Sequence, residues 1–207
     1  MENTKEKYIE DLKTIRQMMD RSGRFISLSG MAGVIAGCIA ILSAYAAYEL
    51  VYEEQDYFSY RKALVTYKEL MLLIFLAAAT VLSSIGIGFY LTVQKAKKHG
   101  QEIWGSESKQ FLGSFFPALV TGGILVLILL WKGFVGLAAP LCLLFYGLAL
   151  VNASKFTLKE TRSLGYLEIV LGLLGIYFIG YGLAFWVIGF GFAHIGYGIY
   201  MHLKYGS

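Results

Sequence analysis

The stretch FLGSFFPALVTGGILVLILLW, residues 111–131, runs for 21 positions without a charged side chain. An α-helix rises about 1.5 Å per residue, so a helix of this length crosses the ~30 Å hydrocarbon core of a bilayer. The chain contains five other apolar runs of similar length. The six runs cover residues 25–48, 70–93, 111–131, 133–151, 164–181 and 183–203. We therefore predict an all-α fold, an integral membrane six-helix bundle.

Composition supports a membrane protein over a soluble one. The chain has 207 residues, of which 57% are hydrophobic and 15% charged. Soluble domains carry about 25% charged residues, so six apolar runs leave too little polar surface to coat a globule. We expect residues 24–207 to form one six-span domain, preceded by a cytoplasmic amphipathic helix within residues 1–23.

The basic residues predict the orientation. Of the 18 Lys and Arg residues, all but four precede the first span, follow the last, or lie in the second and fourth connections. The four exceptions are Arg61, Lys62, Lys68 and Lys132. Short loops rich in Lys and Arg stay in the cytoplasm, so we expect a multi-pass protein of the inner (plasma) membrane with both termini inside. The same asymmetry accounts for the net charge of +4 without a nucleic-acid partner.

Residues 3–22 have the pattern of an amphipathic helix. Asn3 and Glu6 have the spacing of a capping box, and apolar residues recur at helical intervals after them. Such a helix lies on the membrane surface or docks a protein partner. Both interpretations stay open.

Glycines and prolines predict how the spans pack. In lipid, helices associate through small residues that let backbones approach closely. Glycines recur at helical spacing in spans one, five and six, and these seams suit contacts within one subunit or within a homo-oligomer equally. The glycines are Gly33 and Gly37, then Gly165, Gly172 and Gly175, then Gly182, Gly189 and Gly196. Pro117 and Pro140 should each bend a helix.

Short connections and a weak repeat suggest an arrangement of three tandem helical hairpins. Arg24, Lys109 and Arg162 each precede a span and are each followed 13 positions later by a glycine. Convergence is the alternative, since every span needs small residues and a cation at its inner end.

Glu168 is the most informative single residue. It lies six positions after Arg162, which places it about 9 Å into the membrane. A carboxylate there costs several kcal/mol unless it is paired, protonated or wetted. Glu168 shares a helix face with Gly165 and Gly172, so we expect it to point into the bundle.

The residues expected near Glu168 lie in the cytoplasmic half of other spans. They are His194, His202, Asn152 and Arg24. Histidine titrates near neutral pH and relays protons. The set therefore predicts a polar intramembrane site with Glu168 as the proton- or cation-responsive group, or else a structural pair that fixes helix register.

Enzyme signatures are absent from the sequence: there is no G-x-S-x-G, H-E-x-x-H or Walker pattern. We expect no catalytic residues, no bound metal and no cofactor. A zinc site needs three or four convergent ligands, and Cys38 and Cys142 fall inside spans, where they have the character of small packing residues.

The segment IRQMMDRSGRFISLSGMAG, residues 15–33, together with the span layout, resembles the start of a family of uncharacterised bacterial six-span membrane proteins. Some members are labelled β-carotene monooxygenase. Carotenoid-cleaving oxygenases bind iron through four histidines and this chain has three, so the resemblance supplies no site residues.

Three functions follow from these features. The first is transport or permeation of a small solute or ion, with Glu168 and His194 in the path. The second is a non-transporting sensor, regulatory or assembly module that uses helix 3–22. The third is an integral-membrane enzyme acting on a lipid or isoprenoid.

Overall fold

The computed structural model describes residues 30–52, 66–98 and 104–205, and every element in these ranges is helical. The elements are α2 (Gly30–Tyr52), α3 (Tyr67–Lys98), α4 (Ser106–Trp131), η2 (Val135–Leu137), α5 (Ala138–Ala153), η3 (Ser154–Phe156), α6 (Lys159–Tyr177), α7 (Gly182–Trp186), the π-helix η4 (Val187–Ala193) and α8 (His194–Tyr205). The predicted amphipathic helix within residues 1–23, Arg24 and most of the connection after α2 lie outside the described residues.

Among the described residues, five helical segments are long and apolar enough to cross a membrane. They begin at Gly30, Tyr67, Ser106, Val135 and Gly182. These segments make the chain a multi-pass membrane protein. The helix α6, which covers most of the fifth predicted span, is 19 residues long and falls short of this measure. Its charged residues lower its mean hydropathy; they are Lys159, Glu160, Arg162 and Glu168.

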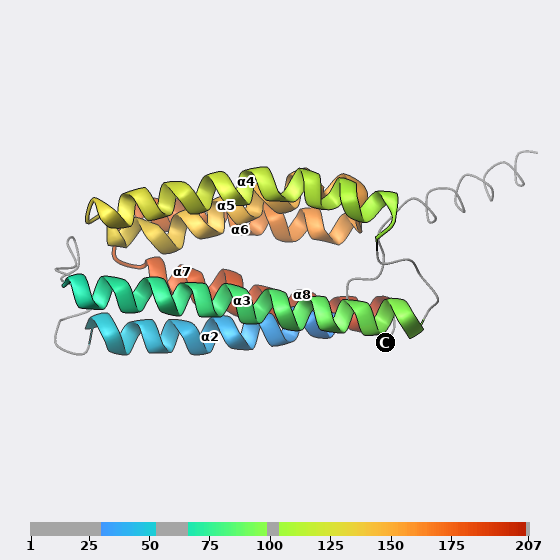
Figure 1. The fold of residues 1–207 in the computed structure, drawn as a ribbon, viewed down its shortest axis with the longest axis horizontal. Helices are drawn as coiled ribbons and strands as arrows, with labels where there is room; N and C mark the ends of the chain where they lie inside the picture. The colour runs from blue at the N-terminus through green and yellow to red at the C-terminus, as the bar shows by residue number, and fades with distance from the viewer. Residues whose placement is uncertain (1–29, 53–65, 99–103, 206–207) are drawn as a thin grey trace, which may run out of the picture.

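The helices form two halves that lie side by side (Figure 1). The α4–α6 half contains α4, α5 and α6, with α5 packed against both neighbours. The α2–α8 half contains α2, α3 and the continuous α7–η4–α8 segment, with α2 packed against both neighbours. α2 and α5 are each the middle helix of their half. Small residues on these two helices make the close contacts with neighbouring helices.

The halves do not follow the predicted hairpins throughout. Consecutive spans pair as expected in α2–α3 and α4–α5. The last two spans do not, because α6 packs chiefly on α5 while η4 and α8 pack chiefly on α2. The physical reason is the placement of small residues: Gly165 and Gly172 of α6 face α5, whereas Gly191 of η4 and Gly198 of α8 face α2.

Close contacts at glycines, which we call glycine seams, stabilise each half: one seam lies between α5 and α6, and the other between α2 and the η4–α8 segment. A Cβ built on Gly147 of α5 would lie 2.6 Å from the carbonyl oxygen of Gly165 on α6. A Cβ on Gly33 of α2 would lie 3.2 Å from the Cα of Gly198 on α8, and one on Gly37 would lie 2.7 Å from the carbonyl oxygen of Gly191. The close backbone contacts predicted for Gly33, Gly37, Gly165 and Gly172 are therefore present. Gly196 makes no such contact within the described part of the chain, since a Cβ there meets nothing within 4 Å.

The two prolines differ in position. Pro117 lies inside α4, as predicted. Pro140 lies in the first turn of α5, because the span begins as the 3₁₀-helix η2 and turns α-helical at Ala138. The N–H groups of a first turn have no partner within their helix, so the proline is tolerated here, and the predicted bend at Pro140 stays a prediction. Its buried ring packs against Gly175 and Gly182.

The described basic residues gather at one end of the molecule. We call this the basic end; it includes the end of α3, the starts of α4 and α6, and the ends of α5 and α8. Its cations are Lys95, Lys97, Lys98, Lys109, Lys155, Lys159, Arg162 and Lys204. The opposite end carries Lys68 and Lys132.

Candidate functional site

The carboxyl group of Glu168 is buried in the junction between the two halves. Gly165 and Gly172 place it on the inward face of α6, and its exposed fraction is 0%. Among the described residues, neither carboxyl oxygen has a hydrogen-bond partner. Burying an ionised carboxylate without a partner costs several kcal/mol. The position is therefore expensive for an acid, and packing alone does not explain it.

His194 faces Glu168 from the other half. Its Nδ1 lies 3.4 Å from Oε1 of Glu168, and 3.0 Å from the carbonyl oxygen of Gly189. A carbonyl oxygen accepts only, so Nδ1 carries the hydrogen and donates it to Gly189. In the neutral ring Nε2 is then an acceptor, and the hydroxyl of Tyr146, 2.9 Å away, donates to it. The carboxyl is thus close to the imidazole without sharing its proton.

The backbone of η4 makes room for this arrangement. The segment Val187–Ala193 is a π-helix, a rare form that recurs at functional sites. A Cβ on Gly189 would lie 2.5 Å from Oε2 of Glu168 and 2.5 Å from Cδ2 of Leu143. Glycine at position 189 is therefore what allows the carboxyl to approach this backbone.

Aromatic rings enclose the imidazole. The ring centroid of His194 is 5.4 Å from that of Tyr146 and 5.7 Å from that of Phe190. Phe190 in turn contacts Trp186, whose Nε1 donates to the carbonyl oxygen of Ala40 on α2. The Tyr146 ring also meets Phe115 edge-on, at 5.9 Å. The surroundings of the Glu168–His194 contact are thus largely apolar, which raises the electrostatic cost of any charge placed there.

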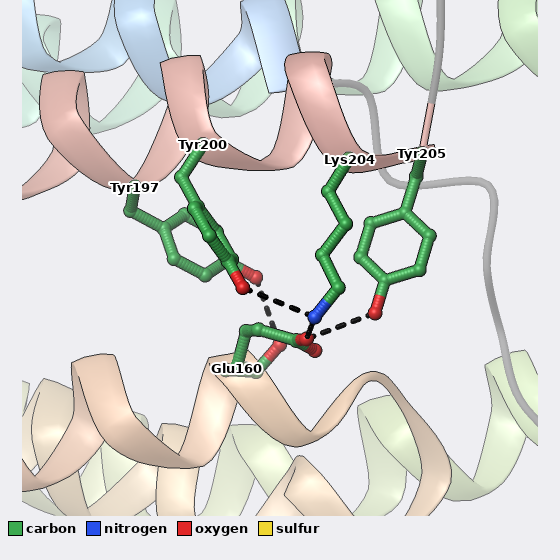
Figure 2. A network of polar contacts seen from close by, with 6 residues as sticks. Glu160, Tyr197, Tyr200, Lys204 and Tyr205 are labelled. Atoms are coloured by element: carbon green, nitrogen blue, oxygen red, sulfur yellow. Dashed lines mark hydrogen bonds and ion pairs between the residues drawn. The ribbon is translucent and has the colours of Figure 1, made fainter.

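Two further polar contacts join α6 to α8 closer to the basic end. The hydroxyls of Thr161 and Tyr197 lie 3.0 Å apart. Beyond them, Oε1 of Glu160 accepts hydrogen bonds from Nζ of Lys204, at 2.5 Å, and from the hydroxyl of Tyr205, at 2.9 Å. Figure 2 shows Glu160 on one helix reaching Lys204 and Tyr205 of the other, with Tyr200 beside Lys204. With Tyr146, Glu168 and His194, these residues form three groups of polar contacts across the junction, which we call the junction ladder.

Glu160 has a perturbed pKa at its end of the ladder. It precedes the apolar part of α6, and its side chain is 17% exposed. Burial alone raises the pKa of this carboxyl, but the hydrogen bonds from Lys204 and Tyr205 and the charge of Lys204 outweigh it, and the pKa is lower than usual. The folded protein therefore favours the ionised form of Glu160.

The structure brings together only part of the predicted site. Glu168 and His194 meet, as described. Asn152 points elsewhere, since its Nδ2 donates to the carbonyl oxygen of Ser114 on α4. His202 lies two turns beyond His194, where the backbone of α8 passes Gly30. Arg24 lies outside the described residues.

Sequence reasoning missed Tyr146 and the Glu160 contacts. A tyrosine in the middle of an apolar span was a usable signal for Tyr146, because a buried hydroxyl needs a partner. The pairing of Glu160 with Lys204 spans 44 positions, and nothing in the local sequence marks it.

Among the described residues, no three His, Cys, Asp or Glu side chains are grouped so as to hold a metal ion. No family model, curated protein or solved structure matches this chain. The candidate site is therefore interpreted from its own residues and contacts.

Proposed function

We propose that this membrane protein moves a small solute or ion through the junction between its two halves, with Glu168 as the group that binds and releases a proton or a monovalent cation. The observation that carries the proposal is the buried Glu168 carboxyl, whose oxygens have no hydrogen-bond partner among the described residues. Ionisable residues at membrane depth mark ion and proton pathways.

The contacts across the junction support a moving interface. Within each half, helices meet backbone to backbone at glycines. Between α6 and α8, long side chains bridge the gap through the junction ladder. Such contacts exchange for water at a modest free-energy cost. Many transporters work by rocking one bundle against another around a midplane site.

In this proposal His194 is a positioning residue for the Glu168 carboxyl. Its Nε2 is held by Tyr146 and its Nδ1 by Gly189, so the ring is fixed beside the Glu168 carboxyl. A proton arriving at the carboxyl neutralises it in place. A small cation would instead pair with the carboxylate directly.

Flux in liposomes tests this function. The purified protein is reconstituted with an internal pH dye, a potassium gradient and valinomycin, and proton entry is recorded; a sodium gradient is tested the same way. We expect flux above that of protein-free liposomes, and a fall to that background in Glu168→Gln. Glu107→Gln, at the start of α4, is the matched control and should keep full flux. Background flux in the unaltered protein, or full flux in Glu168→Gln, would reject the proposal.

A non-transporting sensor is the second candidate, favoured by the complete enclosure of Glu168. A sensor would change conformation on protonation without flux. In that case the unaltered protein gives background flux, while a pH-dependent change in its protease cleavage pattern is lost in Glu168→Gln.

For orientation, we propose that the basic end faces the cytoplasm. The support is its excess of Lys and Arg over the opposite end. Fusing a reporter that is active only in the cytoplasm to the C-terminus, which follows α8, should give an active fusion. An inactive one, with the same reporter active at Lys132, would reverse the assignment.

A further inference from the structure

A pocket opens at the basic end of the α4–α6 half, away from the junction ladder. Its volume is about 370 Å³. It lies where α5 ends, η3 turns and α6 begins. The residues that line it are Leu148, Val151, Asn152, Ser154, Lys155 and Arg162.

The lining changes character along the helix axis. Val151 immediately precedes Asn152 near the end of α5, Leu148 lies about one turn before Val151, and Leu148 is 41% exposed. Ser154, Lys155 and Arg162 follow at the basic end. The pocket is thus apolar on its membrane side and cationic at its rim, the sequence of environments that a phospholipid offers from acyl chain to headgroup.

The two cations are available to a ligand. Neither Lys155 nor Arg162 has an acidic partner within 4 Å in the part of the chain that the structure describes. Nε of Arg162 donates to the hydroxyl of Tyr166, 3.0 Å away, and the guanidinium lies 5.5 Å from that ring's centroid. This contact fixes the side chain and leaves its two terminal NH₂ groups for a second partner. A planar guanidinium pairs with phosphate through two parallel hydrogen bonds.

Asn152 closes the wall on the α4 side. Its Nδ2 is committed to the carbonyl oxygen of Ser114, so its role is to tie α4 to α5 beside the pocket. The pocket therefore has a fixed polar wall, two cations and an apolar floor.

We propose that this pocket binds the phosphodiester headgroup of an anionic phospholipid, with Arg162 and Lys155 on the phosphate and one acyl chain along Leu148 and Val151. The inference goes beyond the proposed transport function and uses none of its residues.

The test is lipid retention by the full-length protein in detergent, measured by native mass spectrometry during titration with phosphatidylglycerol. The double variant Lys155→Gln/Arg162→Gln should bind about 30-fold more weakly, because each near-surface cation contributes about fivefold. The control is Lys97→Gln/Lys98→Gln, which removes two charges from the same end and none from the pocket, and it should bind within about twofold of the unaltered protein. Equal losses in the two double variants, or no loss in either, would overturn the proposal.

Two further experiments distinguish binding of the lipid from binding of free phosphate and exclude misfolding of a variant as the cause of lost binding. Inorganic phosphate at millimolar concentration should fail to displace the lipid, because it cannot use the apolar floor; displacement by phosphate alone would contradict the acyl-chain contact. Phosphatidylglycerol carrying a diazirine on its acyl chain should crosslink to Leu148 or Val151 in the unaltered protein, whose folding is not in question. Crosslinks confined to other helices would reject this pocket.

Discussion

The glycine seams within the halves and the polar junction between the halves are stabilised by different interactions. At the seams, Gly147 meets Gly165 and Gly33 meets Gly198 with no space for a methyl group. At the junction, side chains bridge α6 and α8 through hydroxyl, imidazole and carboxyl groups. The seams are stabilised by close packing, which fails abruptly when disturbed. The junction is stabilised by exchangeable hydrogen bonds, which suits the movement of one half against the other that we propose.

The largest expected effect is at a seam. Gly147→Ala would place a methyl carbon 2.6 Å from one backbone oxygen and 2.8 Å from a backbone nitrogen, and backbone cannot swing away. We expect a loss of about 3 kcal/mol in the free energy of unfolding, measured by denaturant unfolding in detergent. Gly123→Ala, where a Cβ meets nothing within 4 Å, should be neutral or stabilising by up to about 1 kcal/mol. Equal effects at the two positions would refute the seam.

At Gly189 we expect a smaller effect on stability than at Gly147, together with a large effect on flux. A methyl group there meets the ends of two side chains, Glu168 and Leu143, which can shift. We expect Gly189→Ala to cost about 1–2 kcal/mol and to lower flux as Glu168→Gln does, since the carboxyl is displaced. Gly196→Ala, seven residues along the same span and in open space, should leave both unchanged. Normal flux in Gly189→Ala would show that the position of the carboxyl is not critical.

Tyr146→Phe removes the donor to Nε2 of His194 while keeping the ring. The buried nitrogen then lacks a partner, so we expect a loss of about 1 kcal/mol, measured by the same unfolding assay. Tyr177→Phe, on a side chain that is 80% exposed, should have no effect. Identical stabilities for the two variants would mean that the Tyr146 hydroxyl does not hold the histidine.

The smallest effect is expected at the basic end of the ladder, and it depends on pH. Glu160 has a lowered pKa in the folded protein, so its contribution to stability is fully present above its unfolded pKa of about 4.3 and is lost as pH falls through the folded value. The unaltered protein should melt slightly above Glu160→Gln at pH 7, and the gap should narrow as the pH falls below about 4.3. Partly exposed pairs contribute little. A gap that persists or widens at low pH would reverse the assigned direction.

The sequence predicted the parts of this structure that follow from helical periodicity. The apolar runs located the helices, and the shared face of Gly165, Glu168 and Gly172 predicted that the carboxyl points inward. The orientation of the chain in the membrane stays a prediction.

Sequence periodicity could not predict contacts that depend on how helices choose partners. Whether α8 would pair with α6 or with α2 is decided by where glycines meet in three dimensions, and the hairpin prediction failed there. The contact of Tyr146 with His194 and that of Asn152 with α4 likewise depend on how the helices pack. The π-helical segment could not be foreseen either, since its single extra residue per turn has no compositional signature.

The proposed function requires that the junction open to water around Glu168. Leu143 tests it most directly, because its side chain is fully buried beside Gly189. In a chain with Cys38 and Cys142 replaced by alanine, Leu143→Cys is exposed to a membrane-impermeant, positively charged thiol reagent in liposomes, with the exposed Lys132→Cys as the positive control. We predict that the thiol at position 143 reacts more slowly than the control but to completion. A thiol that stays unmodified while the control reacts fully would mean that the junction is sealed, and would contradict the account.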